Sequence, residues 1–123
     1  VATASIGYPL DFIEKIRKAT RYKGFKYIHL LAPCPVGWRF PPSKTIEVGR
    51  LAVLTGMWPL YEVERGEFRL TGVSRSLLDK SKRTPIVEYI KIQGRFSHIS
   101  EEEIRILEEY VDKLWNDIRK IIS

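Results

Sequence analysis

The chain has 123 residues, of which 44% are hydrophobic and 29% are charged, so it has the size of one domain and the composition of a folded protein. Its formal net charge is +6, but basic residues are interleaved with acidic ones and no common nucleic-acid-binding motif is present. No apolar run approaches the roughly 20 residues of a membrane span, and the single cysteine suits a reducing compartment. We therefore predict a cytoplasmic protein that binds neither nucleic acid nor a membrane.

The first third of the chain predicts a βαβ unit and hence an α/β fold. Residues 1–5 are typical of a strand, residues 11–20 have apolar residues at helical spacing, and residues 27–31 form an apolar run that we expect to be a buried strand. A strand, a helix and a strand at this spacing imply parallel strands with a right-handed crossover. The helix would pack on the sheet through one apolar face, made of Phe12, Ile13, Ile16 and Ala19.

Cys34 follows the second strand, in a loop at the carboxyl end, where open α/β sheets place their ligands. Pro33 and Pro35 fix φ and push Cys34 toward an extended conformation, so its sulfur is presented from a stiff backbone. Three roles are open: a small buried hydrophobe, which is the commonest role of a lone cysteine, a nucleophile with His29, or one ligand of a metal cluster completed elsewhere. The pair with His29 is disfavoured, because these two residues of an extended segment point to opposite faces.

No other residue forms a recognisable catalytic or metal-binding motif. The chain has no Walker loop, no dinucleotide-binding glycine motif, no HExxH and no nucleophile elbow. His29 lies within a predicted strand, where we expect a partnered, partly buried side chain, and His98 lies in a loop where we expect a structural role. We therefore predict no catalytic residue in this chain.

Two helices are predicted in the middle of the chain. Ser43 or Thr45 can cap the first, which runs to about Thr55 and is followed by Gly56 at the position where glycine is favoured. Pro85 suits the first turn of the second, a short helix with an apolar stripe. That stripe consists of Ile86, Val87 and Ile90.

Between these helices we expect a β-hairpin and a basic connection. Residues 60–63 and 68–70 have strand composition and flank a turn that Gly66 can supply. Residues 71–84 contain the densest basic segment and are expected to be a solvated linker. The alternative is a surface that steers an acidic partner, such as an electron-carrier protein.

The last helix begins at a capping box, in which Ser100 is the cap and Glu103 reaches back. Its apolar residues recur alternately three and four apart, which predicts a helix that packs on the parent domain or on another subunit. They are Ile104, Leu107, Val111, Leu114, Ile118 and Ile121. A non-catalytic module that docks partner subunits is therefore one hypothesis for the function.

Several short motifs, in their order and spacing, resemble a known family over nearly the whole chain. They are Ala2-Thr3-Ala4-Ser5, Tyr8-Pro9, Asp11-Phe12, His29-Leu30-Leu31-Ala32-Pro33-Cys34-Pro35, Gly37-Trp38-Arg39-Phe40, Thr45-Ile46-Glu47, Gly49-Arg50-Leu51-Ala52-Val53, Trp58-Pro59-Leu60-Tyr61-Glu62 and Gln93-Gly94-Arg95-Phe96. In these motifs the chain resembles the β subunit of pyruvate:ferredoxin oxidoreductase, or pyruvate synthase, of the 2-oxoacid:ferredoxin oxidoreductase family. It departs from that family between about Gly72 and Thr84 and at surface positions of the helices.

The resemblance implies a multi-subunit oxidoreductase of anaerobes and archaea. Such enzymes decarboxylate a 2-oxoacid on thiamine diphosphate, transfer the acyl group to coenzyme A and pass electrons through 4Fe–4S clusters to ferredoxin. By this resemblance Cys34 is the fourth thiolate ligand of one 4Fe–4S cluster. The other three cysteines, and the residues that bind thiamine diphosphate and Mg²⁺, would lie upstream of Val1, so the chain alone is expected to be inactive.

The resemblance also implies a domain organisation and a substrate. The chain would be the C-terminal portion of the β subunit, with residues 1–56 ending the thiamine-diphosphate-binding domain and residues 57–123 forming an extension of hairpin, basic linker and docking helices. Its partners would be the other oxidoreductase subunits. Pyruvate is the expected substrate, and a branched-chain 2-oxoacid such as 2-ketoisovalerate is the alternative.

Overall fold

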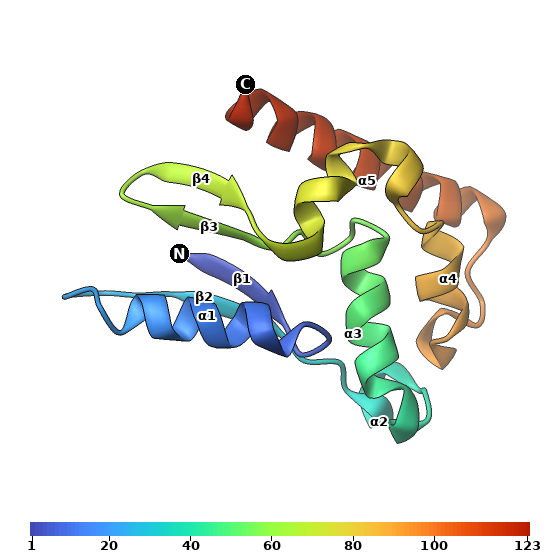
Figure 1. Ribbon diagram of the computed structural model, residues 1–123. Coiled ribbons are helices and arrows are strands. Elements are labelled where there is room, and N and C mark those ends of the chain that lie inside the picture. Colours follow the sequence, from blue (N-terminus) through green and yellow to red (C-terminus); the bar gives the residue numbers. More distant parts are fainter.

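The computed structural model describes residues 1–123, which form a four-stranded sheet with helices packed on it and beside it (Figure 1). The strands are β1 (Ala2–Ser5), β2 (Ile28–Leu31), β3 (Tyr61–Glu64) and β4 (Glu67–Leu70). The α-helices are α1 (Pro9–Ala19), α2 (Pro35–Trp38), α3 (Thr45–Leu54), α4 (Ile86–Lys91) and α5 (Glu101–Ile122). The 3₁₀-helices are η1 (Pro42–Lys44), η2 (Gly72–Leu78), η3 (Lys80–Lys82) and η4 (Gly94–Phe96).

The strand order β2-β1-β3-β4 confirms the α/β class and makes the sheet mixed. β1 and β2 are parallel, with Ala2 opposite Ile28 and Ser5 opposite Leu31, so the predicted βαβ unit is present with α1 as its crossover. β3 pairs antiparallel with β1, and β4 completes the hairpin (Figure 1). The hairpin thus extends the same sheet on the side of β1 away from β2.

β2 is an edge strand and not the buried strand that we predicted. Its residues are half-buried, except for His29, which is exposed. The reason is its place in the sheet: β1 is its one neighbour, and its other edge is unpaired. An apolar run cannot by itself distinguish a central strand from an edge strand.

The buried face of α1 also differs from the prediction. The helix begins at Pro9, where proline suits the first turn, but Ile13 and Ile16 of the predicted apolar face are each 42% exposed. The one buried residue of the helix is Lys15, which is 4% exposed. A charged side chain therefore occupies the centre of the contact between α1 and the sheet.

Lys15 can be buried because its ammonium group is fully partnered. Nζ donates hydrogen bonds to the Thr3 carbonyl (2.8 Å), to Asp11 Oδ2 (2.6 Å) and to Thr71 Oγ1 (2.6 Å). Burial lowers the pKa of Lys15, and the adjacent Asp11 carboxylate opposes that shift. Through these bonds one side chain ties α1 to β1 and to the residue that precedes η2.

The hairpin turn and the end of α3 confirm the predictions, whereas the start of α3 does not. Arg65 and Gly66 have φ values of 52° and 79°, the left-handed region that a two-residue hairpin turn requires. Gly56, with φ 85°, follows the last turn of α3 as predicted. Neither Ser43 nor Thr45 caps α3, because η1 runs directly into it and the Thr45 hydroxyl donates back to a carbonyl of η1.

The basic connection is folded, so the prediction of a solvated linker was wrong. η2 and η3 occupy most of it, and Ser74 and Leu77 are buried. Arg83 has a side chain only 8% exposed, which pairs with the Asp112 carboxylate at 3.2 Å and lies 5.1 Å from the centre of the Trp115 ring. These contacts fix the connection against α5.

α5 begins at the predicted capping box and packs on its own chain. The Ser100 hydroxyl accepts from the Glu103 N–H at 3.1 Å, and the Glu103 carboxylate accepts from the Ser100 N–H at 2.8 Å. The largest core consists of Leu70, Leu77, Ile86, Ile90, Val111, Trp115 and Ile118. Val111 and Ile118 of the predicted apolar stripe are therefore buried within the chain, whereas Ile121 at its end is 61% exposed. The other stripe residues, Ile104, Leu107 and Leu114, are half-buried against the same core. The hypothesis that this helix docks partner subunits stays a prediction.

A second core lies between α3 and α4 and supports the loop after β2. It consists of Phe40, Val48, Ala52 and Tyr89. α4 begins one residue after Pro85, and its buried side chains include the predicted Ile86 and Ile90, whereas Val87 is 39% exposed. Because Phe40 is buried here, the end of the segment that follows Cys34 is anchored in this core.

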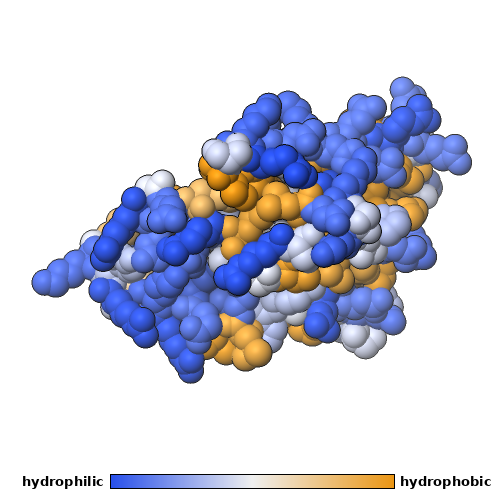
Figure 2. Space-filling view, turned by 45° about the horizontal axis from the view of Figure 1, so that its top comes forward, coloured by the Kyte–Doolittle hydropathy of each residue, from blue (hydrophilic) through white to orange (hydrophobic).

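No helix of the protein is long and apolar enough to cross a membrane. Apolar side chains nevertheless reach the surface in patches between charged ones (Figure 2). The most exposed are Phe25 (91%), Val36 (88%) and Leu10 (78%). With Ile13 and Ile16, Leu10 leaves part of the outer face of α1 uncovered by this chain.

Candidate functional site: the Cys34 turn

Cys34 lies beyond the carboxyl ends of the parallel strands β1 and β2, the position at which α/β sheets place ligands. Its backbone is extended, with φ −103° and ψ 107°, as the flanking prolines predict. Pro33 is buried and anchors the loop, whereas Cys34 is exposed. The interpretation of Cys34 as a small buried hydrophobe is therefore wrong.

The sulfur of Cys34 caps the short helix α2. Sγ accepts a hydrogen bond from the Gly37 N–H at 3.3 Å, and the Trp38 N–H donates to the Cys34 carbonyl at 2.8 Å. A Cβ at position 37 would lie 3.4 Å from Sγ, so the sulfur packs directly against this residue. We call residues 34–40 the Cys34 turn. It presents an exposed sulfur that already has one backbone N–H directed at it.

An exposed cysteine sulfur that accepts a backbone hydrogen bond fits the role of one ligand of an iron–sulfur cluster. Such clusters are held by cysteine thiolates, and hydrogen bonds to the sulfurs tune their potential. The chain has no group of three or more His, Cys, Asp or Glu side chains placed to hold a metal ion. Cys34 can therefore supply one ligand, and a cluster bound there would take its others from outside these 123 residues.

Neither His29 nor His98 forms a hydrogen bond with the Cys34 sulfur. The bond to Sγ comes from Gly37 and not from His29, as expected from their opposite directions. His29 is exposed and not partly buried, although its ring packs edge-on against Trp58 with the ring centres 4.7 Å apart. His98 is exposed in the loop before α5.

The structure brings to the Cys34 turn a segment to which sequence reasoning assigned no role. The Gly94 N–H donates to the Arg39 carbonyl at 2.6 Å, and the Arg95 guanidinium lies 3.9 Å from the centre of the Trp38 ring. The sequence signal was a Gly–Arg pair directly after a short helix. Its partner could not be identified, because the two segments are far apart along the chain.

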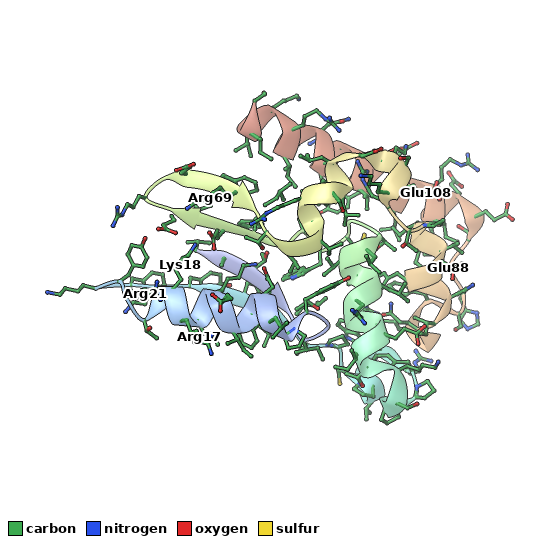
Figure 3. The ribbon with its side chains drawn as sticks, viewed as in Figure 1. Arg17, Lys18, Arg21, Arg69, Glu88 and Glu108 are labelled. Atoms are coloured by element: carbon green, nitrogen blue, oxygen red, sulfur yellow. The ribbon has the colours of Figure 1, made fainter.

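A second polar cluster lies between α1 and the hairpin, near the amino ends of β1 and β2. Lys18 lies on α1 and Arg69 on β4 (Figure 3). Lys18 Nζ lies 2.6 Å from the Glu62 carboxylate, and the Arg69 guanidinium lies 3.3 Å from that of Glu64. The Tyr22 hydroxyl donates to Glu64, which holds the pKa of that carboxyl below its usual value. The adjoining cavity has a volume of about 210 Å³. Because its charges pair with one another, this cluster mainly ties α1 to the hairpin.

The chain is similar to subunits of two oxidoreductases from archaea. It is 51% identical to pyruvate synthase subunit PorB of Methanothermobacter marburgensis, over 97% of this chain and 39% of that protein. It is 43% identical to ketoisovalerate oxidoreductase subunit VorB of Pyrococcus furiosus, over 98% of this chain and 37% of that protein. It is 41% identical to pyruvate synthase subunit PorB of the same organism, over 94% of this chain and 39% of that protein. No protein-family model matches the chain.

The chain thus spans little more than a third of the length of the curated relatives it matches. The similarity extends over almost all of its own residues, including both the Cys34 turn and the α4–η4 segment that contacts it. The resemblance found in the sequence is therefore confirmed: the chain is homologous to one segment of the PorB subunit of pyruvate synthase and of the VorB subunit of ketoisovalerate oxidoreductase.

Proposed function

We propose that the chain is the C-terminal portion of the β subunit of a 2-oxoacid:ferredoxin oxidoreductase, and that Cys34 is one thiolate ligand of a 4Fe–4S cluster. The observation that carries this proposal is the exposed sulfur of Cys34, held by a proline-flanked turn with the Gly37 N–H directed at it. Such a cluster, when bound, accepts and passes on electrons one at a time. The turn's part is to hold the sulfur still and to supply it with a backbone hydrogen bond.

The remaining chemistry of the complex belongs to residues outside this chain. Thiamine diphosphate with Mg²⁺ would supply the decarboxylation chemistry, coenzyme A would accept the acyl group and ferredoxin would accept the electrons. Residues 1–56 would end the thiamine-diphosphate-binding domain, and residues 57–123 would form its extension. Support comes from the uncovered apolar side chains Leu10 and Phe25, which suit a chain that packs against the rest of a longer subunit.

We infer that pyruvate is the substrate, with 2-ketoisovalerate as the second candidate. The pyruvate synthase subunit of Methanothermobacter marburgensis is 51% identical to this chain, but in Pyrococcus furiosus the pyruvate synthase and ketoisovalerate oxidoreductase subunits are 41% and 43% identical to it. Substrate choice therefore needs a direct assay. Initial rates of ferredoxin reduction with each 2-oxoacid, measured on one preparation, give the ratio of kcat/KM that defines it.

The test of the site uses the full-length subunit assembled with its partner subunits and purified without oxygen. Cys34→Ser is compared with wild type and with Val36→Ser, a matched control that places the same side chain on the same turn at a position 88% exposed. The measurements are iron content, the paramagnetic spectrum of the reduced clusters and pyruvate-dependent reduction of ferredoxin. We expect Cys34→Ser to lose or alter one cluster and to reduce ferredoxin near the background rate, and Val36→Ser to behave as wild type.

A Cys34→Ser complex with the wild-type spectrum and rate would overturn the assignment of Cys34. Equal losses in Cys34→Ser and Val36→Ser would also count against it, because they would reflect damage to the turn and not loss of a ligand. A complex that retains its clusters but oxidises neither 2-oxoacid would contradict the proposed activity.

A further inference from the structure

The exposed Arg95 side chain lies at the Cys34 turn and is held there by two aromatic rings and two hydrogen bonds. Its guanidinium carbon lies 3.9 Å from the centre of the Trp38 ring and 4.6 Å from that of Phe96. Nε donates to Gln93 Oε1 at 2.7 Å, and a terminal nitrogen donates to the Tyr89 hydroxyl at 3.3 Å. The guanidinium therefore lies within cation–π distance of both rings.

The group that holds Arg95 is itself rigid. Gln93 is only 2% exposed, and its Nε2 donates to the Tyr89 carbonyl at 2.7 Å. Tyr89 belongs to the buried core between α3 and α4. Trp38, the last residue of α2, packs against that core directly, and Arg95 adds a second link between them.

A second contact closes the other side of the turn. Arg39, the C-cap of α2, has φ 55°, and its carbonyl accepts a short hydrogen bond of 2.6 Å from the Gly94 N–H. A Cβ at position 94 would lie 2.8 Å from Arg39 Cβ and 2.9 Å from its carbonyl oxygen, so only glycine fits there. The left-handed backbone of a non-glycine residue is unfavourable, and this hydrogen bond offsets part of its cost.

We propose that Arg95 is a positioning residue for Cys34. By holding Trp38, whose N–H donates to the Cys34 carbonyl, it keeps α2 closed and the Gly37 N–H directed at the Cys34 sulfur. The proposal rests on the proposed function, in which that sulfur is a cluster ligand. The hydrogen bond to the Cys34 sulfur comes from Gly37 and not from Arg95, so Arg95 acts through the geometry of the turn.

The experiment compares Arg95→Met and Arg95→Lys in the full-length subunit, assembled with its partners. Arg105→Met is the matched control, because it removes the same charge from an exposed position on α5 that makes no hydrogen bond or ion pair. Hydrogen–deuterium exchange of residues 34–40 reports closure of the turn, and a potentiometric titration of the reduced-cluster spectrum reports the environment of the sulfur. Exchange over α5 and the thermal midpoint verify that each variant is folded.

We expect Arg95→Met to raise exchange in residues 34–40 about threefold to fivefold, the effect of losing a cation–π contact at an exposed position, and to shift the cluster's reduction potential. Arg95→Lys keeps the charge but loses the guanidinium that contacts the Trp38 ring and donates to Gln93 and Tyr89. It should therefore raise the exchange of residues 34–40 and shift the reduction potential in the same direction as Arg95→Met, but by less. Arg105→Met should show neither.

The proposal is overturned if Arg95→Met matches Arg105→Met in exchange, or if its exchange rises while the potential stays at the wild-type value. An Arg95→Lys variant with wild-type exchange and potential would attribute the effect to charge alone and would also overturn it. The Cys34→Ser variant separates the two proposals. A complete set of clusters in that variant would refute the ligand role of Cys34. Hydrogen–deuterium exchange of residues 34–40 in Arg95→Met would still report whether Arg95 closes the turn. If Arg95→Met fails to fold, Trp38→Phe, which keeps a ring beneath the guanidinium, tests the same contact by the same two measurements.

Discussion

Replacing Lys15 by methionine should destabilise the chain strongly, because the change keeps the length of the side chain but removes a buried charge from three acceptors. The variant leaves the Thr3 carbonyl, Thr71 Oγ1 and the Asp11 carboxylate without their shared donor. Breaking a buried ion pair by removing one partner costs about 3–5 kcal/mol. We expect a value near the lower limit, about 3 kcal/mol, since the Asp11 side chain is 14% exposed and can be partly hydrated.

The assay is urea unfolding of the chain, followed by tryptophan fluorescence. Lys18→Met is the matched control on the same helix: its ammonium pairs with Glu62 and Glu64, but the side chain is 41% exposed. A pair of that kind contributes at most about 1 kcal/mol. Adding Asp11→Asn to Lys15→Met removes the unpaired charge and should recover part of the loss. A smaller loss for Lys15→Met than for Lys18→Met would refute the inference that Lys15 is the central tie between α1 and the sheet.

Two further predictions concern a turn and a titration. Gly56→Ala should lower the free energy of unfolding more than Gly66→Ala does. Both glycines have a similar positive φ, 85° and 79°. A Cβ at position 56 would lie 2.5 Å from Trp115 Nε1, whereas position 66 faces open space. Urea unfolding of both variants checks this, and equal losses would show that backbone strain alone decides. Glu64 has a lowered pKa in the folded chain because the Tyr22 hydroxyl donates a hydrogen bond to its carboxylate. The stabilisation from this carboxylate is therefore complete above the pKa of Glu64 in the unfolded chain, and it is lost as the pH falls through the lower pKa of the folded chain. Wild type should therefore lose more stability than Glu64→Gln on acidification from about pH 5 to pH 3, and unfolding profiles that stay parallel over this range would contradict the assigned hydrogen bond.

Local features of this protein are determined by the sequence near them. The hairpin turn at Arg65 and Gly66 and the capping box at Ser100 each depend on residues within a few positions of one another. The βαβ unit pairs strands that are farther apart, Ala2 with Ile28, but each of its three elements has its own local residue pattern. Glycine allows a positive φ, and a serine with a glutamate three residues later satisfies free N–H groups, whatever the rest of the chain does. Such elements could be predicted correctly.

Cys34 was identified from the same kind of local information. The flanking prolines predict its extended backbone, and the strand before it predicts its place beyond the carboxyl edge of the sheet. Composition could not decide between a buried and an exposed thiol. That choice depends on what packs over the turn, and the structure leaves the sulfur exposed.

Tertiary structure decided which faces are covered. Lys15 is buried and Ile13 is exposed because the acceptors of the ammonium group come from β1, from α1 and from the segment before η2, which only the fold brings together. The basic connection is ordered because Arg83 meets Asp112 and Trp115 on a helix that begins after it in the chain. Residue patterns report how apolar a face is, but not which partner reaches it.

The contact between Arg95 and the Cys34 turn is also decided by tertiary structure. Arg95 and Trp38 lie in separate segments, and each has an ordinary local sequence. They meet because α3 and α4 pack through a common core that includes Phe40 and Tyr89. The sequence alone thus determined the kinds of element and the exposed chemistry that Cys34 can offer, whereas packing between distant segments determined how rigidly that sulfur is held.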